Sequence, residues 1–364
     1  SDMRDRVIFT FVCAGTFVLC VVMGPFYCII GLFGIIFGVY YELFNLPKYV
    51  ERNKSIKNLS SIYWGFFWIG AYFAHVYTIK DHLEWLRKYY YLRILLDYHN
   101  LICFCLYAAN FYRFFLNLQK GVMRYQIGKL GLAHFGFLIF IMGSACMEVN
   151  IFHGMIWFCL PVSSIIVNDI FALICGRLFG RHQLTVISPK KTWEGYLGAI
   201  VVTIFWWFFL TKFCLKFEFL LCPQKDISFV PFDWYYSQCD TSFYKEVLYT
   251  LKIGQFNFDF TRLHSFTLPL NLFASTYGPL GGLFASAFKR SIGIKDFSNL
   301  IPGHGGMTDR MDCQFLMGIF SCMWLGQFVF NANNGVKNAI WAIDNMNDQD
   351  KMQIFNYLKR TLGH

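Results

Sequence analysis

The sequence predicts an all-α, polytopic integral membrane protein with about nine transmembrane helices. Of its 364 residues, 56% are hydrophobic and 20% are aromatic, whereas only 15% are charged. Soluble globular chains carry about 25% charged residues, so this chain has too little polar surface to coat a water-soluble particle. The composition excludes a disordered chain, a fibre and a soluble domain that binds nucleic acid.

Nine apolar stretches account for the predicted helices, because a helix needs about 20 mostly apolar residues to cross a bilayer. The first leads directly into the second without a cleavage site, so we expect a span there and not a signal peptide. The eighth contains Pro269, Pro279 and Gly281-Gly282, and we expect it to be broken and to line a cavity. The stretches are residues 7–23, 25–43, 62–79, 96–116, 128–146, 153–176, 194–216, 268–286 and 313–331.

Lysine and arginine predict the orientation of these helices. Among the short loops, most of these residues lie in the loops after the second, fourth, sixth and eighth stretches. Positively charged loops stay in the cytosol, so we place these loops there and the long polar and aromatic loop 217–267 on the opposite side. The two cysteines of that loop, Cys222 and Cys239, allow a disulfide. We expect one integral domain, 1–364, with its catalytic half at about 153–332.

The densest polar cluster runs from Ser286 to Asp312, between the last two apolar stretches. Asp309 and Asp312 are three residues apart, so on a helix they share a face. Two such carboxylates repel each other unless a cation lies between them, and hard oxygen ligands suit Mg²⁺. Asp296 is a candidate third ligand, brought in by the turn at Pro302-Gly303.

The same cluster contains more basic residues than a carboxylate metal site alone would explain. Arginine and lysine bind phosphate oxygens, and glycines let backbone N–H groups approach an anion closely. A carboxylate-held metal beside a cationic, glycine-rich loop is typical of phosphoryl or nucleotidyl transfer. The alternative, a solvated cytosolic loop, explains the charge but not the glycines around His304. His304 itself is a candidate base, a structural residue that hydrogen-bonds the glycine loop, or a residue that contacts the substrate. The basic residues and glycines are Lys289, Arg290, Lys295, Arg310, Gly303, Gly305 and Gly306.

Two smaller clusters lie upstream. In the run Ser188–Gly195, Lys190 and Lys191 are suited to phosphate, and Thr192 with Glu194 is suited to capping the next helix. Taken alone, that run is explained as well by a helix cap with a positive flank. Asp169 follows Asn168 inside an apolar stretch, where a carboxylate indicates a functional site; the alternative is a polar contact between helices.

The run from Ser286 to Asp312 resembles the signature of the phosphatidate cytidylyltransferases, also called CDP-diacylglycerol synthases. Asn168-Asp169 and Ser188–Gly195 are similar to further motifs of that family, in the expected order. Bacterial members have an acidic metal ligand four positions before the signature serine, where this chain has Gly282, so it resembles the eukaryotic branch. The matching signature positions are Ser286, Phe288, Lys289, Arg290, Lys295, Asp296, Ser298, Ile301, Pro302, His304, Gly305, Gly306, Asp309, Arg310 and Asp312.

The resemblance implies that CTP and phosphatidic acid react to give CDP-diacylglycerol and pyrophosphate, with Mg²⁺ as cofactor. It implies a multi-pass protein of the endoplasmic reticulum membrane whose active site faces the cytosol, with no nucleic-acid partner; a homodimer is left open. The expected catalytic residues are Asp296, Asp309, Asp312, Lys295 and His304. Those expected to bind substrate are Ser286, Lys289, Arg290, Arg310, Lys190, Lys191, Ser188, Gly305 and Gly306. The expected metal ligands are Asp309 and Asp312, with Asp296 or Asp169 replacing the missing bacterial ligand.

Two other functions compete with this one. A CTP-dependent polyprenol or lipid kinase would share the helices and a cationic nucleotide loop, but it gives no reason for the full signature. A transporter for an anionic solute would spread its charged residues over several spans and would show internal symmetry. In this chain the charged residues concentrate in the predicted cytosolic loops, and no repeat is visible.

Overall fold

The structure, a computed structural model, divides into two compact units, residues 1–322 and 323–364, which we treat separately. Within the first unit, the arrangement of helices positions all of the candidate site residues that the structure describes. The described residues are 2–46, 53, 55–186, 188, 191–224, 227–232, 239, 241–254, 256–298, 305–330, 343, 346 and 348–362.

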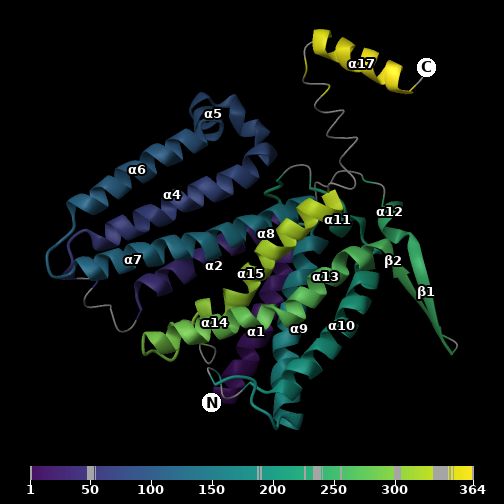
Figure 1. The fold of residues 1–364 in the computed structure, drawn as a ribbon, viewed down its shortest axis with the longest axis horizontal. Coiled ribbons are helices and arrows are strands. Elements are labelled where there is room, and N and C mark those ends of the chain that lie inside the picture. Colours follow the sequence, from purple (N-terminus) through teal and green to yellow (C-terminus); the bar gives the residue numbers. More distant parts are fainter. Residues whose placement is uncertain are drawn as a thin grey trace. The chain divides into compact units, whose positions relative to one another are not determined.

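The first unit is built mainly of helices (Figure 1). α7 (Met123–Gly136) continues through a π-helical turn, Phe137–Ile141, into α8 (Met142–His153). Two short 3-10 turns, Lys80–His82 and Glu84–Lys88, join α4 (Leu59–Ile79) to α5 (Tyr90–Asp97). The second unit holds the end of α15, a π-helical turn at Leu325–Phe330 and α17 (Asp348–Leu362). The remaining helices, which belong to the first unit except for the end of α15, are α1 (Asp2–Met23), α2 (Pro25–Phe44), α6 (His99–Leu116), α9 (Ile156–Phe179), α10 (Trp193–Cys214), α11 (Glu218–Leu221), α12 (Ser242–Lys245), α13 (Arg262–Thr276), α14 (Gly278–Ser291) and α15 (Thr308–Trp324).

The helical membrane architecture agrees with the sequence, but the expected count of nine spans is not confirmed. Among the described residues, four helical segments are long and apolar enough to cross a bilayer, and the pair α5–α6, bent by 74°, would make a fifth. α13, α14 and α15 have 15, 14 and 17 residues, fewer than the roughly 20 that a span needs. The four segments are Pro25–Phe44, Met123–His153, Ile156–Phe179 and Trp193–Cys214.

The expected break in the stretch 268–286 is present. Tyr277 separates α13 from α14, and Pro279 occupies one of the first positions of α14. Proline has no N–H to donate, so it fits the first turn of a helix and interrupts a longer one. The break lets α14 take its own direction and carry the signature residues from Ser286 to Arg290.

The segment 217–267, expected to be a polar and aromatic loop of an all-α protein, contains a β-hairpin. β1 (Val247–Ile253) pairs antiparallel with β2 (Phe256–Thr261), with Gly254 at φ +62° in the turn. The alternation of Phe256, Phe258 and Phe260 with polar residues is a strand signal that the helix-based interpretation missed. The disulfide that the loop cysteines allowed is present between Cys222 and Cys239.

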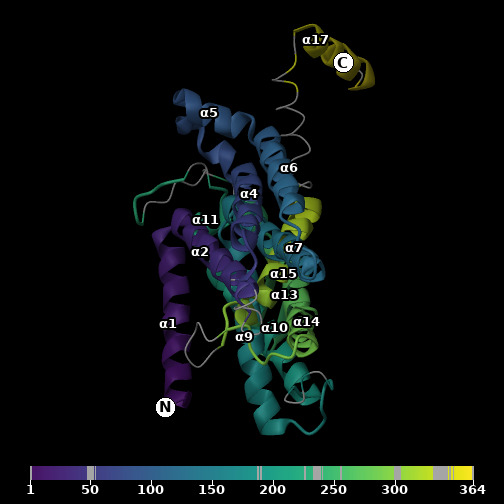
Figure 2. The same cartoon turned by 90° about the vertical axis from the view of Figure 1, so that its left-hand side faces the viewer.

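α9 and α10 lie side by side in both views of the fold (Figures 1 and 2). Glycine makes this close approach possible, because a Cβ on Gly195 would lie 2.7 Å from the carbonyl oxygen of Ala172 and 2.9 Å from the Cα of Gly176. Small residues at a crossing let two membrane helices pack backbone to backbone. Further along the same pair of helices, Asn168 of α9 accepts a hydrogen bond from Thr203 in the middle of α10.

We predict that Gly195→Ala loosens this crossing. The added methyl group meets backbone atoms that cannot rotate away, so the variant should lose about 1–3 kcal/mol of unfolding free energy. Thermal unfolding of the purified protein in detergent measures the loss. Gly34→Ala on α2 is the matched control, since its new methyl group would have nothing within 4 Å. Equal melting temperatures for the two variants would contradict the role of Gly195.

Candidate active site

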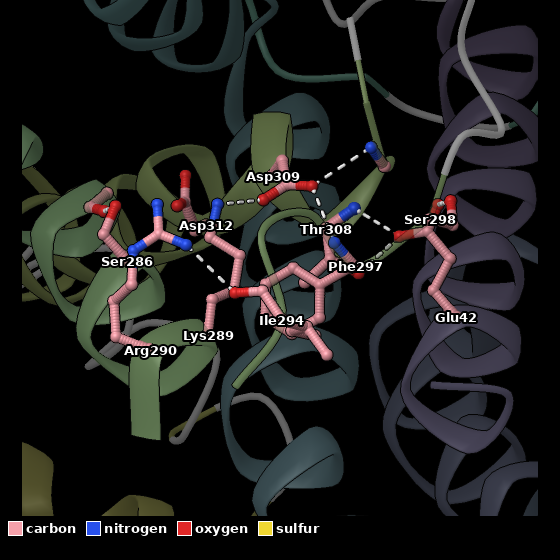
Figure 3. A network of polar contacts seen from close by, with 12 residues as sticks. Glu42, Ser286, Lys289, Arg290, Ile294, Phe297, Ser298, Thr308, Asp309 and Asp312 are labelled. Atoms are coloured by element: carbon pink, nitrogen blue, oxygen red, sulfur yellow. Dashed lines mark hydrogen bonds and ion pairs between the residues drawn. The ribbon is translucent and has the colours of Figure 1, made fainter. Parts of the chain in front are cut away.

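The N-terminus of α15 is held by two carboxylates (Figure 3). The first N–H groups of a helix have no partner within the helix. Glu42 of α2 accepts hydrogen bonds from the N–H groups of Met307 (2.7 Å) and Thr308 (2.8 Å), and Asp309 accepts one from Gly306 (3.0 Å). Both negative charges lie at the positive end of the helix dipole, where they stabilise the helix.

Glu42 is a site residue that the sequence interpretation missed. Its carboxylate also accepts hydrogen bonds from the hydroxyl groups of Ser298 (2.6 Å) and Thr308 (2.7 Å), and the residue is only 2% exposed. The contact joins α2 to the signature across more than 250 residues of sequence. One signal could have revealed it: Glu42 is an isolated carboxylate within the apolar stretch 25–43, and such residues are functional candidates by default.

Asp309 connects α14 to α15. Its Oδ1 forms an ion pair with Lys289 of α14, and its Oδ2 accepts hydrogen bonds from the N–H groups of Phe297 (3.1 Å) and Gly306. The side chains of Lys289 and Asp309 are 12% and 8% exposed, so water screens the pair only weakly. Both carboxylate oxygens therefore have protein partners, which favours a positioning role for Asp309.

Glycine is required where the signature loop passes between the carboxylates. Gly305 has φ +83°, a left-handed conformation that side chains disfavour. A Cβ at this position would lie 3.4 Å from Asp309 and 3.7 Å from Asp296. At Gly306, a Cβ would come within 2.9 Å of Glu42. The structure thus places Asp296 near Asp309, as expected, and puts both glycines in contact with carboxylates.

Asp312 belongs to a second group of charges, formed with Asp169 of α9 and Lys191. Burial raises the pKa of Asp312 to about 6; a hydrogen bond from the Cys313 N–H opposes the rise, Asp169 adds to it and Lys191 opposes it. Asp312 nevertheless keeps part of its surface accessible, and Asp169 is exposed. Crowded but accessible carboxylates are suited to binding a cation or a charged substrate.

Gly282 makes room for this second group. A Cβ on Gly282 would lie 3.5 Å from the Nζ of Lys191 and 3.8 Å from the Oδ2 of Asp312. The position where bacterial relatives are expected to carry an acid therefore faces the two charged side chains. Lys191 occupies that neighbourhood in this chain.

The loop before α10 is organised as the sequence predicted. Thr192 is the N-cap of α10 and accepts a hydrogen bond from the N–H of Gly195 (3.2 Å), and Glu194 lies in the first turn. Glu194 also accepts hydrogen bonds from the N–H groups of Arg181 (3.0 Å) and His182 (3.2 Å), which fixes the end of α9 against the start of α10. Asn168 accepts a hydrogen bond from Thr203 (3.4 Å), so it is a contact between helices.

The other residues that the sequence predicted for the site have different surroundings in the structure. Arg290 donates to the carbonyl oxygen of Ile294 (3.0 Å), and the hydroxyl of Ser286 donates to that of Gly282 (2.7 Å), so both stabilise their own segment. Arg310 acts electrostatically on Asp169, whereas Lys295 is exposed. The carbonyl oxygen of Ser188 accepts from the N–H of Lys191 (3.0 Å). Lys190 and His304 lie outside the described residues.

The four candidate metal ligands fall into two groups, Asp296 with Asp309 and Asp169 with Asp312. Within the described part of the chain, no three His, Cys, Asp or Glu side chains form a cluster that could hold a metal ion. Mg²⁺ usually takes only one or two carboxylates and completes its shell with water and substrate phosphates. A pair of carboxylates beside a lysine is therefore compatible with Mg²⁺ held jointly with a nucleotide.

We predict that Glu42→Gln weakens the fold of the signature. The amide offers one acceptor oxygen to four donors and directs an NH₂ group at the rest, so the unfolding free energy should fall by about 1–3 kcal/mol. Thermal unfolding in detergent provides the measurement. The control is Asp97→Asn, which removes a 37% exposed carboxylate beside Arg87 and Arg93 and should cost less than about 1 kcal/mol. A loss at Glu42 no larger than at Asp97 would refute this role.

Known proteins are similar in sequence to this chain over most of its length. The model of the cytidylyltransferase family matches residues 4–328. Phosphatidate cytidylyltransferase 1 of Arabidopsis thaliana is 36% identical, over 96% of this chain and 85% of the relative. Phosphatidate cytidylyltransferase of Saccharomyces cerevisiae is 32% identical, over 98% and 80%. Phosphatidate cytidylyltransferase 1 of Homo sapiens is 35% identical, over 90% and 72%.

Proposed function

The chain belongs to the cytidylyltransferase family, and we propose that it transfers the CMP group of CTP to phosphatidic acid, forming CDP-diacylglycerol and pyrophosphate. The observation that carries the proposal is the second group of charges, where Asp169 and Asp312 lie with Lys191 beside the signature. The names of the relatives agree with this reaction.

The reaction is a displacement at phosphorus. A phosphate oxygen of phosphatidic acid forms a bond to the α-phosphorus of CTP, while the bond from that phosphorus to the bridging oxygen of the β-phosphate breaks. Pyrophosphate leaves with the electron pair. The attacking phosphate is already an anion, so the step needs positioning and charge neutralisation more than a strong base. Lys191, Lys295 and Arg310 are the side chains that we assign to the phosphates.

We assign Mg²⁺ to Asp169 and Asp312. The fit rests on the chemistry of the donors, since burial and mutual repulsion disfavour two adjacent carboxylates without a cation. When bound, Mg²⁺ neutralises charge on the triphosphate and on the leaving pyrophosphate. Asp309 keeps the loop in place through Lys289 and the backbone N–H groups, and Asp296 remains a candidate additional ligand beside Gly305.

We place the site at the cytosolic face of the endoplasmic reticulum membrane, where CTP is available. α10 has 22 residues, which spans roughly 33 Å and matches the thickness of a bilayer core. Lys191 precedes this helix, and the disulfide Cys222–Cys239 follows it. The disulfide then lies on the opposite side of the membrane, in an oxidising compartment.

We predict that the purified protein in mixed micelles with phosphatidic acid, Mg²⁺ and CTP releases pyrophosphate and forms CDP-diacylglycerol. In a panel of nucleotides, CTP should yield far more liponucleotide than ATP, GTP or UTP. A lipid kinase would instead release CDP and no pyrophosphate, so the products separate the two activities. Absence of liponucleotide above the level of a mock preparation would reject the proposal.

We predict that Asp312→Asn stabilises the protein while it abolishes turnover. The folded protein raises the pKa of this carboxyl from its ordinary value near 4 to about 6. Ionisation of Asp312 therefore destabilises the folded protein, and this destabilisation is absent below about pH 4 and reaches its full size above about pH 6. In EDTA at pH 7.5 the variant should therefore gain up to about 3 kcal/mol, and this gain should disappear toward pH 4. Turnover should fall at least about a hundredfold.

Magnesium provides the second readout of this prediction. Mg²⁺ should raise the melting temperature of the wild-type protein and of the control Asp97→Asn, but not that of Asp312→Asn, because binding to the folded state alone stabilises it. The same thermal measurement in EDTA and in Mg²⁺ gives both values. If Mg²⁺ stabilised Asp312→Asn as much as the wild type, Asp312 would not be a ligand.

A further inference from the structure

A groove of about 610 Å³ lies between α7 and α14, on the flank of α14 next to the candidate site. This volume is within the range of roughly 300–1,000 Å³ that ligand pockets in proteins have. We call it the α7–α14 groove. Its lining includes Arg124, Lys129, Leu132, Phe135, Phe284 and Phe288.

The α7–α14 groove has a cationic end and an apolar end. Arg124, in the first turn of α7, is exposed, and within the described part of the chain no hydrogen bond or ion pair engages its guanidinium group. Lys129 lies deeper, is 4% exposed and donates to the carbonyl oxygen of Phe44 (2.7 Å). In the last turn of α7, Phe135 meets Phe284 with ring centroids 5.9 Å apart. An anion with a long apolar tail would match both ends.

Glycine keeps the groove open along α7. Gly128 and Gly131 both line it, and a Cβ at either position would have nothing within 4 Å. A positively charged flank of a membrane helix would explain Arg124. It would not explain two glycines that leave room between the cation and the aromatic side chains of α14.

α14 contributes residues both to the groove and to the candidate site. Phe288 lines the groove and stacks on Phe297, with centroids 6.0 Å apart, while the next residue, Lys289, pairs with Asp309. Ile292, directly after α14, also lines the groove, and Lys295 follows three residues later. A headgroup at the cationic end would therefore lie beside the signature loop.

We propose that the α7–α14 groove binds the phosphatidic acid substrate, with its phosphate beside Arg124 and one acyl chain along Leu132, Phe135 and Phe284. This inference rests on the proposed function and names the place where its lipid substrate binds. Charge complementarity selects an anionic lipid, because a zwitterionic headgroup would bring its own cation to Arg124. A phosphate hydrogen-bonded to the guanidinium group gains the strength of a charge-assisted contact.

The first experiment fills the groove in the full-length protein. Gly131→Leu and Gly128→Leu place a side chain in open space, so they should fold normally and raise the KM for phosphatidic acid by about tenfold, with the KM for CTP changed less than twofold. Arg124→Gln should raise the same KM about tenfold through loss of a charged hydrogen bond. The control, Gly34→Leu on α2, also points into open space and should leave both constants unchanged.

The second experiment measures binding without turnover. A phosphatidic acid with a photoreactive acyl chain should label peptides containing Leu132 and Phe135 in the wild-type protein. Unlabelled phosphatidic acid should compete at least tenfold better than phosphatidylcholine, and Gly131→Leu should lose most of the label.

The outcomes distinguish this inference from the proposed function. An active wild type with an unchanged KM for phosphatidic acid in both glycine variants would overturn the groove assignment alone. Equal competition by phosphatidylcholine would also overturn it, because it would indicate contact with bulk lipid. An inactive wild type that still shows selective labelling would reject the transferase function and retain an anionic-lipid site.

Discussion

The arrangement of the signature depends on satisfying the N–H groups at the start of α15. This helix begins among apolar helices, where an unpaired backbone donor costs free energy comparable to a lost hydrogen bond. Glu42 and Asp309 accept from Gly306, Met307 and Thr308, and Glu42 reaches them from α2. The carboxylates also meet the positive end of the helix dipole. One buried contact therefore joins the N-terminal helices to the loop that carries the chemistry.

A division of labour among the acidic residues follows from this contact. Asp309 has Lys289 and two backbone donors as partners, so its charge is balanced within the protein. Asp312 and Asp169 lie with Lys191, where burial and the mutual repulsion of the two carboxylates raise the pKa of Asp312 and favour the binding of a cation. The signature thus contains one carboxylate that holds the loop, Asp309, and one that we propose meets the substrate, Asp312. Sequence spacing alone makes Asp309 and Asp312 look equivalent, since they are three residues apart.

The position of the site also suits two substrates that come from different phases. The break at Tyr277 lets α14 run beside α7, and α14 then carries Lys289 next to the acidic groups and Phe288 next to an apolar groove. We therefore expect the nucleotide at the acidic groups and the acyl chains of the lipid along the apolar groove, with the two reacting phosphates meeting at the signature loop that follows α14. Glycine at Gly282, Gly128 and Gly131 provides the space on both flanks.

Local patterns in the sequence determined the helical membrane class, the broken stretch before Ser286, the Thr192 cap and the identity of the signature, because periodicity, proline and capping residues act over a few neighbours. Only the tertiary structure decided that Glu42 caps α15, that Asp309 pairs with Lys289 and that Asp169 lies with Asp312. Those contacts join residues from 20 to more than 250 positions apart, and packing of the helices chooses among many equivalent partners. The β1–β2 hairpin was likewise decided by strand pairing in the folded chain, which composition does not reveal.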